Sequence, residues 1–339
     1  MKAVVIEKPG VLQVKDVPIP EPEKNFVRVQ VAACAICATD LEAIEGRIAA
    51  NYPLIPGHEW SGVVDAVGEG VDAHWIGKRV IGSNDVVCCT CDACRSGNWR
   101  YCTAFKEIGF KQNGAYAEYV CVPAYGLYEI PETVSFDEAA LCEPMGVAIG
   151  TMKKTGAMFG QTALILGAGS IGLCMLEICR VMGLRKITVC DLAKDRLAIA
   201  AERGAHRTVV AGEEDIVAVG KTICPEGYDV VIDCTGMEEC IQEGIALTKK
   251  GGTMALAGYG RGKIMNIRID DIHVNNIRFV GAGNNWNHLK LALDLMEDGM
   301  VNVKPFLSEH ITLDEYEKGL DMVKHRPAGF VKALYHFDV

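Results

Sequence analysis

An apolar segment that runs directly into a glycine-rich turn is the feature that most limits how this chain can fold. In the sequence LILGAGSIG, Gly167, Gly169 and Gly172 follow an expected strand at Thr162–Leu166 and open an expected helix over 171–182. From there to about residue 281, further apolar strands alternate with helical segments. Strands separated by helices pair in parallel, so this region predicts a doubly wound α/β sheet. The expected later strands are Lys186–Cys190, His206–Val210, Tyr228–Asp233, Gly251–Gly258 and Ile277–Gly281.

The glycines of this turn fit the binding of a dinucleotide. Gly167 permits a tight turn, Gly169 lets a pyrophosphate approach the backbone, and Gly172 allows a helix to pack closely on the strand. The phosphates would lie at the helix N-terminus. Asp191 ends the next strand, where a carboxylate can bind ribose hydroxyls and would repel a 2′-phosphate. This favours NAD over NADP, although Arg196 lies nearby; a turn that serves packing alone is the alternative.

The first 130 residues show short apolar or alternating segments broken by Gly and Pro, which is typical of a β-rich domain. Ser135 and Glu138 have the spacing of a capping box and predict a helix from about 136 to 154, disturbed at Pro144. A helix to about 298 and a mixed tail end the chain. The expected strands of this region are Lys2–Glu7, Phe26–Ala33, Ser61–Val67, Arg79–Gly82 and Tyr116–Pro123.

Four cysteines are closely spaced as Cys88-x2-Cys91-x2-Cys94-x7-Cys102. Zinc prefers four tetrahedral ligands, and an all-thiolate set leaves no open position. The spacing therefore predicts a structural zinc site that holds a loop. A loop of free thiols is the alternative, and Cys89 leaves open an exchange with Cys88 as ligand.

A second possible ligand set is dispersed: Cys37, His58, Glu59 and Glu143. A single His or buried Cys is more often structural than metal-bound. Together these residues form a Cys/His/carboxylate set, and a catalytic zinc needs about three protein ligands and one open position. We therefore expect a catalytic zinc here.

Charge and cysteine usage exclude some classes. The 339 residues carry a net charge of −10 and no visible basic patch, which argues against nucleic-acid binding. The apolar run at the N-terminus is too short for a signal peptide or membrane span, so we expect a cytoplasmic protein without a membrane partner. The 15 cysteines are then expected as thiols or metal ligands.

The motifs AICATD, IPGHEWSG, CEPMG and GAGSIG, together with the four-cysteine loop, resemble the zinc-containing medium-chain dehydrogenases over nearly the whole chain. Glu143 in a Glu-Pro pair and Glu59 beside His58 resemble the sorbitol and other polyol dehydrogenases. The resemblance implies a GroES-like zinc catalytic domain over 1–147, completed by 286–339, and an NAD-binding Rossmann domain over 148–285. It also implies a small polyhydroxylated substrate and a homodimer or homotetramer.

Carried over to this chain, the resemblance makes Cys37, His58 and Glu59 zinc ligands, with Glu143 binding directly or through water, and Thr39 the hydroxyl that relays the proton. The chain departs from the family pattern at Ala38, at Glu42, where a histidine often completes the relay, and at Asn284 and Asn285, which replace an arginine–aromatic pair of sorbitol-type enzymes. Sorbitol is therefore not assumed as substrate. The implied cofactor contacts are Gly167, Gly169, Ser170, Ile171, Gly172, Asp191, Arg196, Ala257, Gly258, Tyr259, Gly283, Asn284 and Asn285.

The sequence thus predicts an oxidoreductase that transfers a hydride from a secondary alcohol of a polyol or sugar derivative to NAD. A threonine, butanediol or simple secondary alcohol dehydrogenase is the alternative among enzymes. A non-catalytic NAD-binding zinc protein is the alternative from another class. Polar candidates for a substrate pocket are Tyr116, Glu118, Asn284, Asn285, Asn287 and His288.

Overall fold

The computed structural model describes residues 1–282 and 288–339, which form two compact units. The expected domain limits of 1–147 and 148–285 remain a proposal. In the structure, the first segment of the first unit ends at Glu143, and the late segment Gly299–Phe306 belongs to the second unit. Unit 1 comprises Met1–Glu143, Leu289–Asp298 and Leu307–Val339, and unit 2 comprises Pro144–His288 and Gly299–Phe306.

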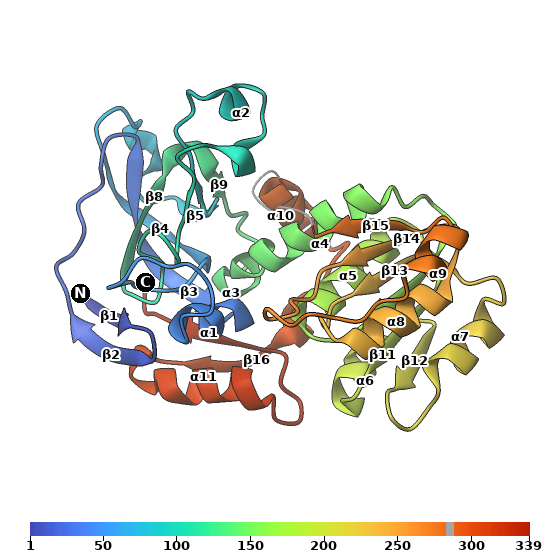
Figure 1. Cartoon of the computed structure of the whole chain (residues 1–339). Coiled ribbons are helices and arrows are strands. Elements are labelled where there is room, and N and C mark those ends of the chain that lie inside the picture. Colours follow the sequence, from blue (N-terminus) through green and yellow to red (C-terminus); the bar gives the residue numbers. More distant parts are fainter. Residues whose placement is uncertain (283–287) are drawn as a thin grey trace. The chain divides into compact units, whose positions relative to one another are not determined.

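Unit 2 contains the doubly wound sheet that the sequence predicts. Its strand order is β12-β11-β10-β13-β14-β15, with every pair parallel, and the strands can be followed in Figure 1. All five residues of β10 are buried, as expected for a strand covered on both faces. The strands are β10 (Thr162–Leu166), β11 (Arg185–Asp191), β12 (Arg207–Val210), β13 (Tyr228–Asp233), β14 (Thr248–Leu256) and β15 (Arg278–Gly281).

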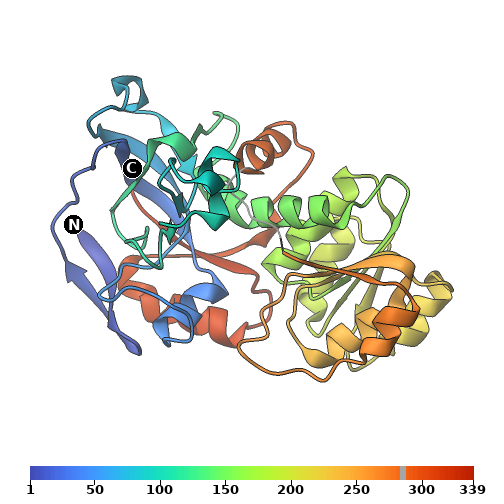
Figure 2. The same cartoon turned by 45° about the horizontal axis from the view of Figure 1, so that its top comes forward.

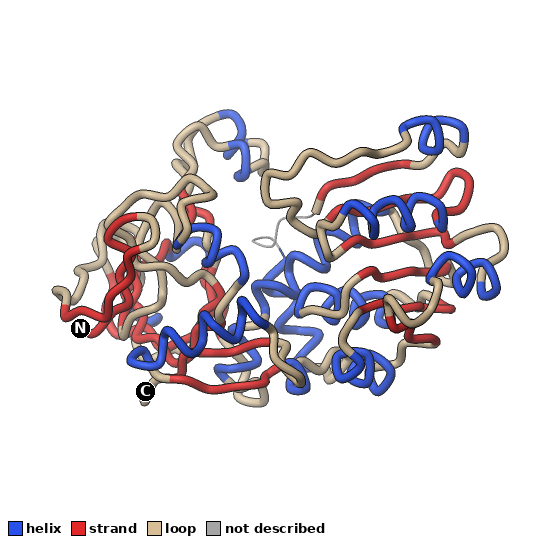
Figure 3. Tube along the Cα trace, turned by 60° about the horizontal axis from the view of Figure 1, so that its bottom comes forward, coloured by secondary structure: helices blue, strands red, loops and turns tan. Residues whose placement is uncertain are grey.

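Helices alternate with these strands, as the helix and strand colours of Figure 3 show. The expected helix over 136–154 is two helices that break at Leu141, before Pro144 rather than at it. Pro144 is tolerated because it lies in the first turn of α4, where backbone N–H groups have no partner within the helix. None of the described helices is long and apolar enough to cross a membrane. Before these strands come α3 (Phe136–Ala140), which belongs to unit 1, and α4 (Cys142–Thr155); between them come α5 (Ser170–Val181), α6 (Lys194–Glu202), α7 (Ile216–Ile223), α8 (Glu238–Leu247) and α9 (Ile269–Val274).

Unit 1 is β-rich, and its seven-stranded sheet joins both ends of the sequence. The order is β16-β17-β3-β4-β5-β9, with β8 also paired to β3. Figure 2 shows the late strands, in red, returning beside the early strands, in blue. The strands are β3 (Phe26–Ala35), β4 (Glu59–Val67), β5 (Arg79–Gly82), β8 (Tyr119–Pro123), β9 (Leu127–Glu129), β16 (Leu307–Ile311) and β17 (Lys332–His336), beside the pairs β1 (Lys2–Lys8) with β2 (Val11–Asp16) and β6 (Asp85–Val86) with β7 (Lys106–Glu107).

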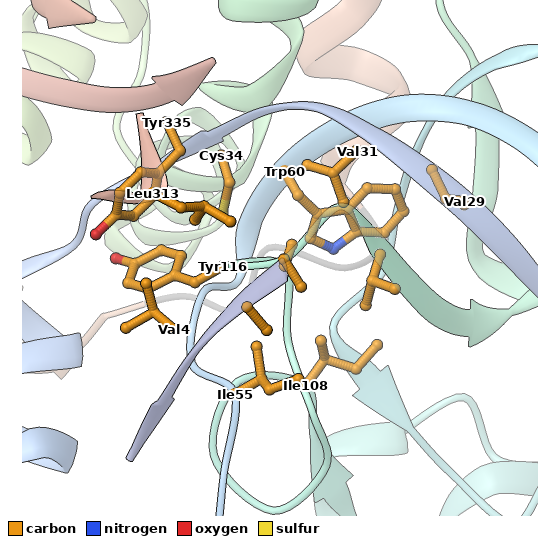
Figure 4. Packing of buried hydrophobic residues seen from close by; sticks show 14 of the residues in the cluster. Val4, Val29, Val31, Cys34, Ile55, Trp60, Ile108, Tyr116, Leu313 and Tyr335 are labelled. Atoms are coloured by element: carbon orange, nitrogen blue, oxygen red, sulfur yellow. The ribbon is translucent and has the colours of Figure 1, made fainter. Parts of the chain in front are cut away.

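The core of unit 1 lies against this sheet (Figure 4). Val29 and Val31 on β3 are fully buried, because alternate residues of a strand face the same side. The rings of Tyr116 and Tyr335 lie 4.6 Å apart at 67°. The helices of this unit, besides α3, are α1 (Ala38–Ile44), α2 (Asp92–Arg95), α10 (Leu289–Glu297) and α11 (Tyr316–His325).

Candidate metal centres and dinucleotide site

The four-cysteine loop brings its sulfur atoms within 4.8 Å of one another. Cys88 Sγ lies 3.9 Å from Cys94 Sγ and 3.6 Å from Cys102 Sγ. Tetrahedral zinc with Zn–S bonds of about 2.3 Å would separate its sulfurs by about 3.8 Å, so these distances fit the ion. Cys89 is exposed, with φ at 57°, and its sulfur lies beside the carbonyl of Val87, outside the cluster. The geometry therefore favours the ligand set Cys88, Cys91, Cys94 and Cys102.

Backbone N–H groups prepare this loop for negative charge. The N–H of Cys91 donates to Cys88 Sγ at 3.3 Å, and the N–H groups of Cys88 and Ala104 donate to Cys102 Sγ at 3.4 Å. Hydrogen bonds, first from Thr90, lower the pKa of Cys88 to about 5, whereas desolvation raises the pKa of Cys94 to about 12. Thiolates bind metal, so a divalent cation would supply the charge that allows all four to ionise.

Pairing of β3 with β4 assembles the second ligand set. Ala35 at the end of β3 pairs with Glu59 at the start of β4, so the segments around Cys37 and His58 lie side by side. One ligand atom from each of Cys37, His58 and Glu59 lies within 4.8 Å of the others. This thiolate, imidazole and carboxylate set suits zinc and is smaller than the four ligands of a closed site.

Asp40 orients this set, although the sequence analysis did not single it out. Its buried carboxylate lies 3.2 Å from His58 Nδ1 and accepts the backbone N–H of Cys37 at 2.9 Å. Burial opposes ionisation, but the charge of His58 and these hydrogen bonds lower the pKa of Asp40. Asp40 thereby holds one ring nitrogen of His58 and leaves the other for a metal. The spacing of three between Cys37 and Asp40 in CATD is the signal that could have identified it.

Tyr116 also serves this network rather than a substrate pocket. It is fully buried, and its hydroxyl donates to Asp40 Oδ2 at 2.5 Å. The prediction that Tyr116 lines a substrate pocket was therefore wrong, because this side chain is completely buried. Glu118 is another such candidate, and it accepts the backbone N–H of Lys2 at 2.8 Å.

Glu59 is paired with a lysine that the sequence did not indicate. Lys332 on β17 is 3% exposed, and its Nζ lies 2.9 Å from Oε1 and 2.7 Å from Oε2 of Glu59. Burial favours the neutral amine, yet the charge of Glu59 raises the pKa of Lys332 above its ordinary value. A metal that uses Glu59 would therefore share this carboxylate with Lys332.

Glu143 lies outside the set of mutually close ligand atoms. Burial raises the pKa of Glu143 to about 8. The charge of His58 lowers this pKa, and the negative charge of Glu59 raises it further. A bound cation would lower this pKa, because opposite charge favours the carboxylate. Its binding to zinc, directly or through water, remains a prediction.

The expected relay residue, Thr39, lies at the start of α1. Thr39 Oγ1 is 3.5 Å from Cys37 Sγ, which places the hydroxyl next to the candidate metal site. Glu42 accepts two hydrogen bonds from Arg47, from Nε at 2.5 Å and from Nη2 at 2.9 Å. Glu42 is thus held in an ion pair where the family often has a histidine.

In unit 2, each glycine of the turn after β10 has the geometry expected of it. Gly167 has φ at 98°, a conformation that favours glycine. A Cβ at Gly172 would lie 1.8 Å from the carbonyl oxygen of Gly167, so α5 packs too closely on the turn for a side chain. A Cβ at Gly169 would meet nothing within 4 Å, which leaves its backbone open to an approaching phosphate. Ser170 and Ile171 follow as the first residues of α5.

Asp191 lies at the end of β11 and contacts this turn. Its Oδ2 accepts the N–H of Ala168 at 2.6 Å, and its Oδ1 accepts the N–H of Ala193 at 2.8 Å. Arg196 Nη2 lies 3.1 Å from the same carboxylate. The acid therefore holds the turn and is partly neutralised by Arg196.

The remaining predicted cofactor contacts follow β14. The N–H groups of Ala257 and Gly258 donate to the carbonyl of Asp233 at 2.8 and 2.9 Å, and Tyr259 is 69% exposed. His288, a candidate for the substrate pocket, has its Nδ1 3.3 Å from Lys153 Nζ. The predicted residues Gly283, Asn284, Asn285 and Asn287 lie outside the described residues.

Comparisons with known proteins identify the family of both domains. Residues 23–132 match the alcohol dehydrogenase GroES-like domain, and residues 170–298 match the zinc-binding dehydrogenase family. The chain is 31% identical to the L-threonine 3-dehydrogenase of Francisella philomiragia over 342 residues, with 96% of both chains covered.

Two solved structures share this fold over nearly the whole chain. A protein of Sinorhizobium meliloti described as a zinc-binding dehydrogenase, bound to NADP, is 32% identical with a TM-score of 0.91. An alcohol dehydrogenase of E. coli complexed with NADH is 26% identical with a TM-score of 0.92. Each match covers 99% of both chains. This chain therefore belongs to the zinc-binding medium-chain alcohol dehydrogenase family.

Proposed function

We propose that this dehydrogenase oxidises a secondary alcohol of a polyol or sugar derivative and transfers the hydride to NAD. The observation that carries the proposal is the set of Cys37, His58 and Glu59, whose ligand atoms lie within 4.8 Å of one another. When bound there, zinc supplies a Lewis acid that stabilises negative charge on the oxygen of the alcohol.

The side chains around this site have separate tasks. Asp40 fixes the ring of His58, and Lys332 balances the charge of Glu59. Thr39 is the proposed relay: its oxygen, 3.5 Å from the sulfur of Cys37, would accept the hydroxyl proton while its own proton passes on to water. General base catalysis by a positioned group contributes about 10²–10⁴ in rate.

The turn after β10 is proposed to bind the pyrophosphate of NAD. The open backbone at Gly169 and the N-terminus of α5 suit a phosphate. Asp191 disfavours a 2′-phosphate because the charges repel, but its pairing with Arg196 weakens that repulsion. Steady-state rates with NAD and NADP test the preference, and an Asp191→Ala variant should narrow the difference between them. A higher kcat/KM with NADP in the unaltered enzyme would overturn it.

An amino alcohol is the second candidate substrate. Curated relatives named L-threonine 3-dehydrogenase match 96–98% of this chain at 31% identity, and the zinc and NAD machinery would be the same. Threonine carries its secondary hydroxyl beside an amine, whereas a polyol carries it beside another hydroxyl.

NADH formation across a substrate panel separates these proposals. The panel contains alditols, inositols, aldoses, their phosphates, small diols and L-threonine. A kcat/KM highest for a polyhydroxylated compound supports the first proposal, and one highest for L-threonine replaces it with the second. Absence of turnover with every compound, with only the cysteine loop holding zinc, would favour a non-catalytic NAD-binding protein.

Substitution of His58 tests the metal site directly. His58→Ala should lose turnover by at least about 10²-fold while NADH binding, followed by fluorescence, is retained. His74→Ala is the matched control, because His74 is an exposed histidine of the same unit. Undiminished oxidation by the His58 variant, or by zinc-free enzyme, would refute the scheme.

A further inference from the structure

Outside the sites above, Asp137, His310 and His336 form a compact cluster on unit 1. Asp137 Oδ2 lies 2.8 Å from His310 Nε2, and Asp137 Oδ1 lies 3.4 Å from His336 Nδ1. One ligand atom from each residue lies within 4.8 Å of the other two. Two imidazoles and one carboxylate therefore converge from three distant parts of the sequence.

Strand pairing explains why the two histidines meet. β16 and β17 are parallel neighbours, and His310 pairs with Leu334. His336 lies two residues beyond Leu334, so both histidines project from the same face of the sheet. Their ring centroids are 5.7 Å apart at 85°.

Asp137 reaches the same point from α3. It lies in the first turn of this helix, within the capping box in which Ser135 accepts the N–H of Glu138. Its side chain is 20% exposed, while each histidine side chain is 51% exposed. The carboxylate is thus held by the fold, and the two rings remain accessible from solvent.

We propose that Asp137, His310 and His336 bind a divalent transition-metal ion, which is additional to the two zinc sites of the family. Imidazole suits Zn²⁺ and Cu²⁺, and affinity for such sites rises towards Cu²⁺. Zinc bonds of about 2.0–2.1 Å in a tetrahedron place ligand atoms about 3.3 Å apart. The two half-exposed rings need only small rotations to reach that spacing.

The site differs from an ordinary ion pair in the number of its imidazoles. His74 with Asp72 and His325 with Asp321 are single histidine–aspartate pairs, with N–O distances of 3.1 and 2.7 Å. Three protein ligands leave further coordination positions for water, and His336 also borders a shallow hollow. An ion bound here would tie α3 to β16 and β17 and so stabilise unit 1 against unfolding.

Calorimetric titration of the zinc-loaded enzyme with Zn²⁺, after removal of loose metal, tests the proposal. We expect one further ion per chain in the unaltered enzyme and in His325→Ala. Affinity should fall at least about tenfold in His310→Ala, His336→Ala and Asp137→Asn. Equal affinity and stoichiometry in all five proteins would overturn the proposal.

Electron paramagnetic resonance with Cu²⁺ provides a second measurement on the unaltered enzyme. With one equivalent of Cu²⁺, the spectrum of the unaltered enzyme should show hyperfine coupling to two imidazole nitrogens. The spectrum of His336→Ala should show coupling to only one. Coupling to a single nitrogen in the unaltered enzyme would refute the site even if the variants failed to fold. Circular dichroism of each variant checks its folding.

Discussion

Exchange of single glycines for alanine in the turn after β10 should separate packing from cofactor binding. A Cβ at position 172 would lie 1.8 Å from the carbonyl oxygen of Gly167, although real Cβ atoms essentially never approach within 3.0 Å. Since the obstructing atom is backbone, the turn and α5 must move apart by more than about 1 Å. Overpacking typically costs about 1–3 kcal/mol, and a rigid obstacle places Gly172→Ala near the upper value.

This cost can be converted to a melting temperature. For a unit of about 150 residues, 1 kcal/mol shifts Tm by about 2–4 °C, so Gly172→Ala should lower the transition of unit 2 by roughly 6–12 °C. Gly169→Ala should leave Tm nearly unchanged, because φ is −72° and its Cβ would meet nothing within 4 Å. Its NADH affinity should nevertheless fall, because the methyl group would occupy the space of the phosphate.

Scanning calorimetry and NADH fluorescence titration measure the two effects. A Gly172→Ala protein with the Tm of the unaltered enzyme would refute the packing argument. A Gly169→Ala protein that binds NADH with unchanged affinity would refute the phosphate position instead, and leave the packing argument intact.

Three further predictions concern unit 1. Lys332→Met should lower the free energy of unfolding by about 3–5 kcal/mol in urea denaturation, because it leaves the buried charge of Glu59 unpaired, and adding Glu59→Gln should recover most of this loss. A double variant whose loss equals the sum of the two single losses would show that the pair is not coupled. Burial raises the pKa of Asp85 to about 6, so the stability that its protonated form contributes is present below about pH 4 and is lost as pH rises through 6. The free energy of unfolding of Asp85→Asn should therefore rise by about 2–3 kcal/mol relative to the unaltered protein between pH 4 and 7 in denaturation curves, and a constant difference would contradict this. Cys94→Ser should reduce bound zinc from about two to about one ion per chain by elemental analysis, whereas Cys89→Ser should keep both; the same count in both variants would oppose the ligand assignment.

The sequence by itself determined the features whose chemistry is local. The turn after β10 was predictable because φ at Gly167 and the close approach at Gly172 are properties of a few adjacent residues. The cysteine loop was predictable for the same reason, since its ligands lie within fifteen residues. Likewise, the alternation of strands and helices after residue 162 was sufficient for the parallel sheet.

Tertiary structure alone decided which side chains far apart in the sequence form ion pairs or hydrogen bonds. Lys332 reaches Glu59 only because β17 joins the sheet of β3 and β4, and Tyr116 reaches Asp40 across the core of the same unit. The meeting of Asp137 with His310 and His336 likewise depends on strand register. Periodicity and spacing report which residues are buried along a segment, whereas ion pairs and ligand sets depend on which segments pair, and pairing is a property of the whole sheet.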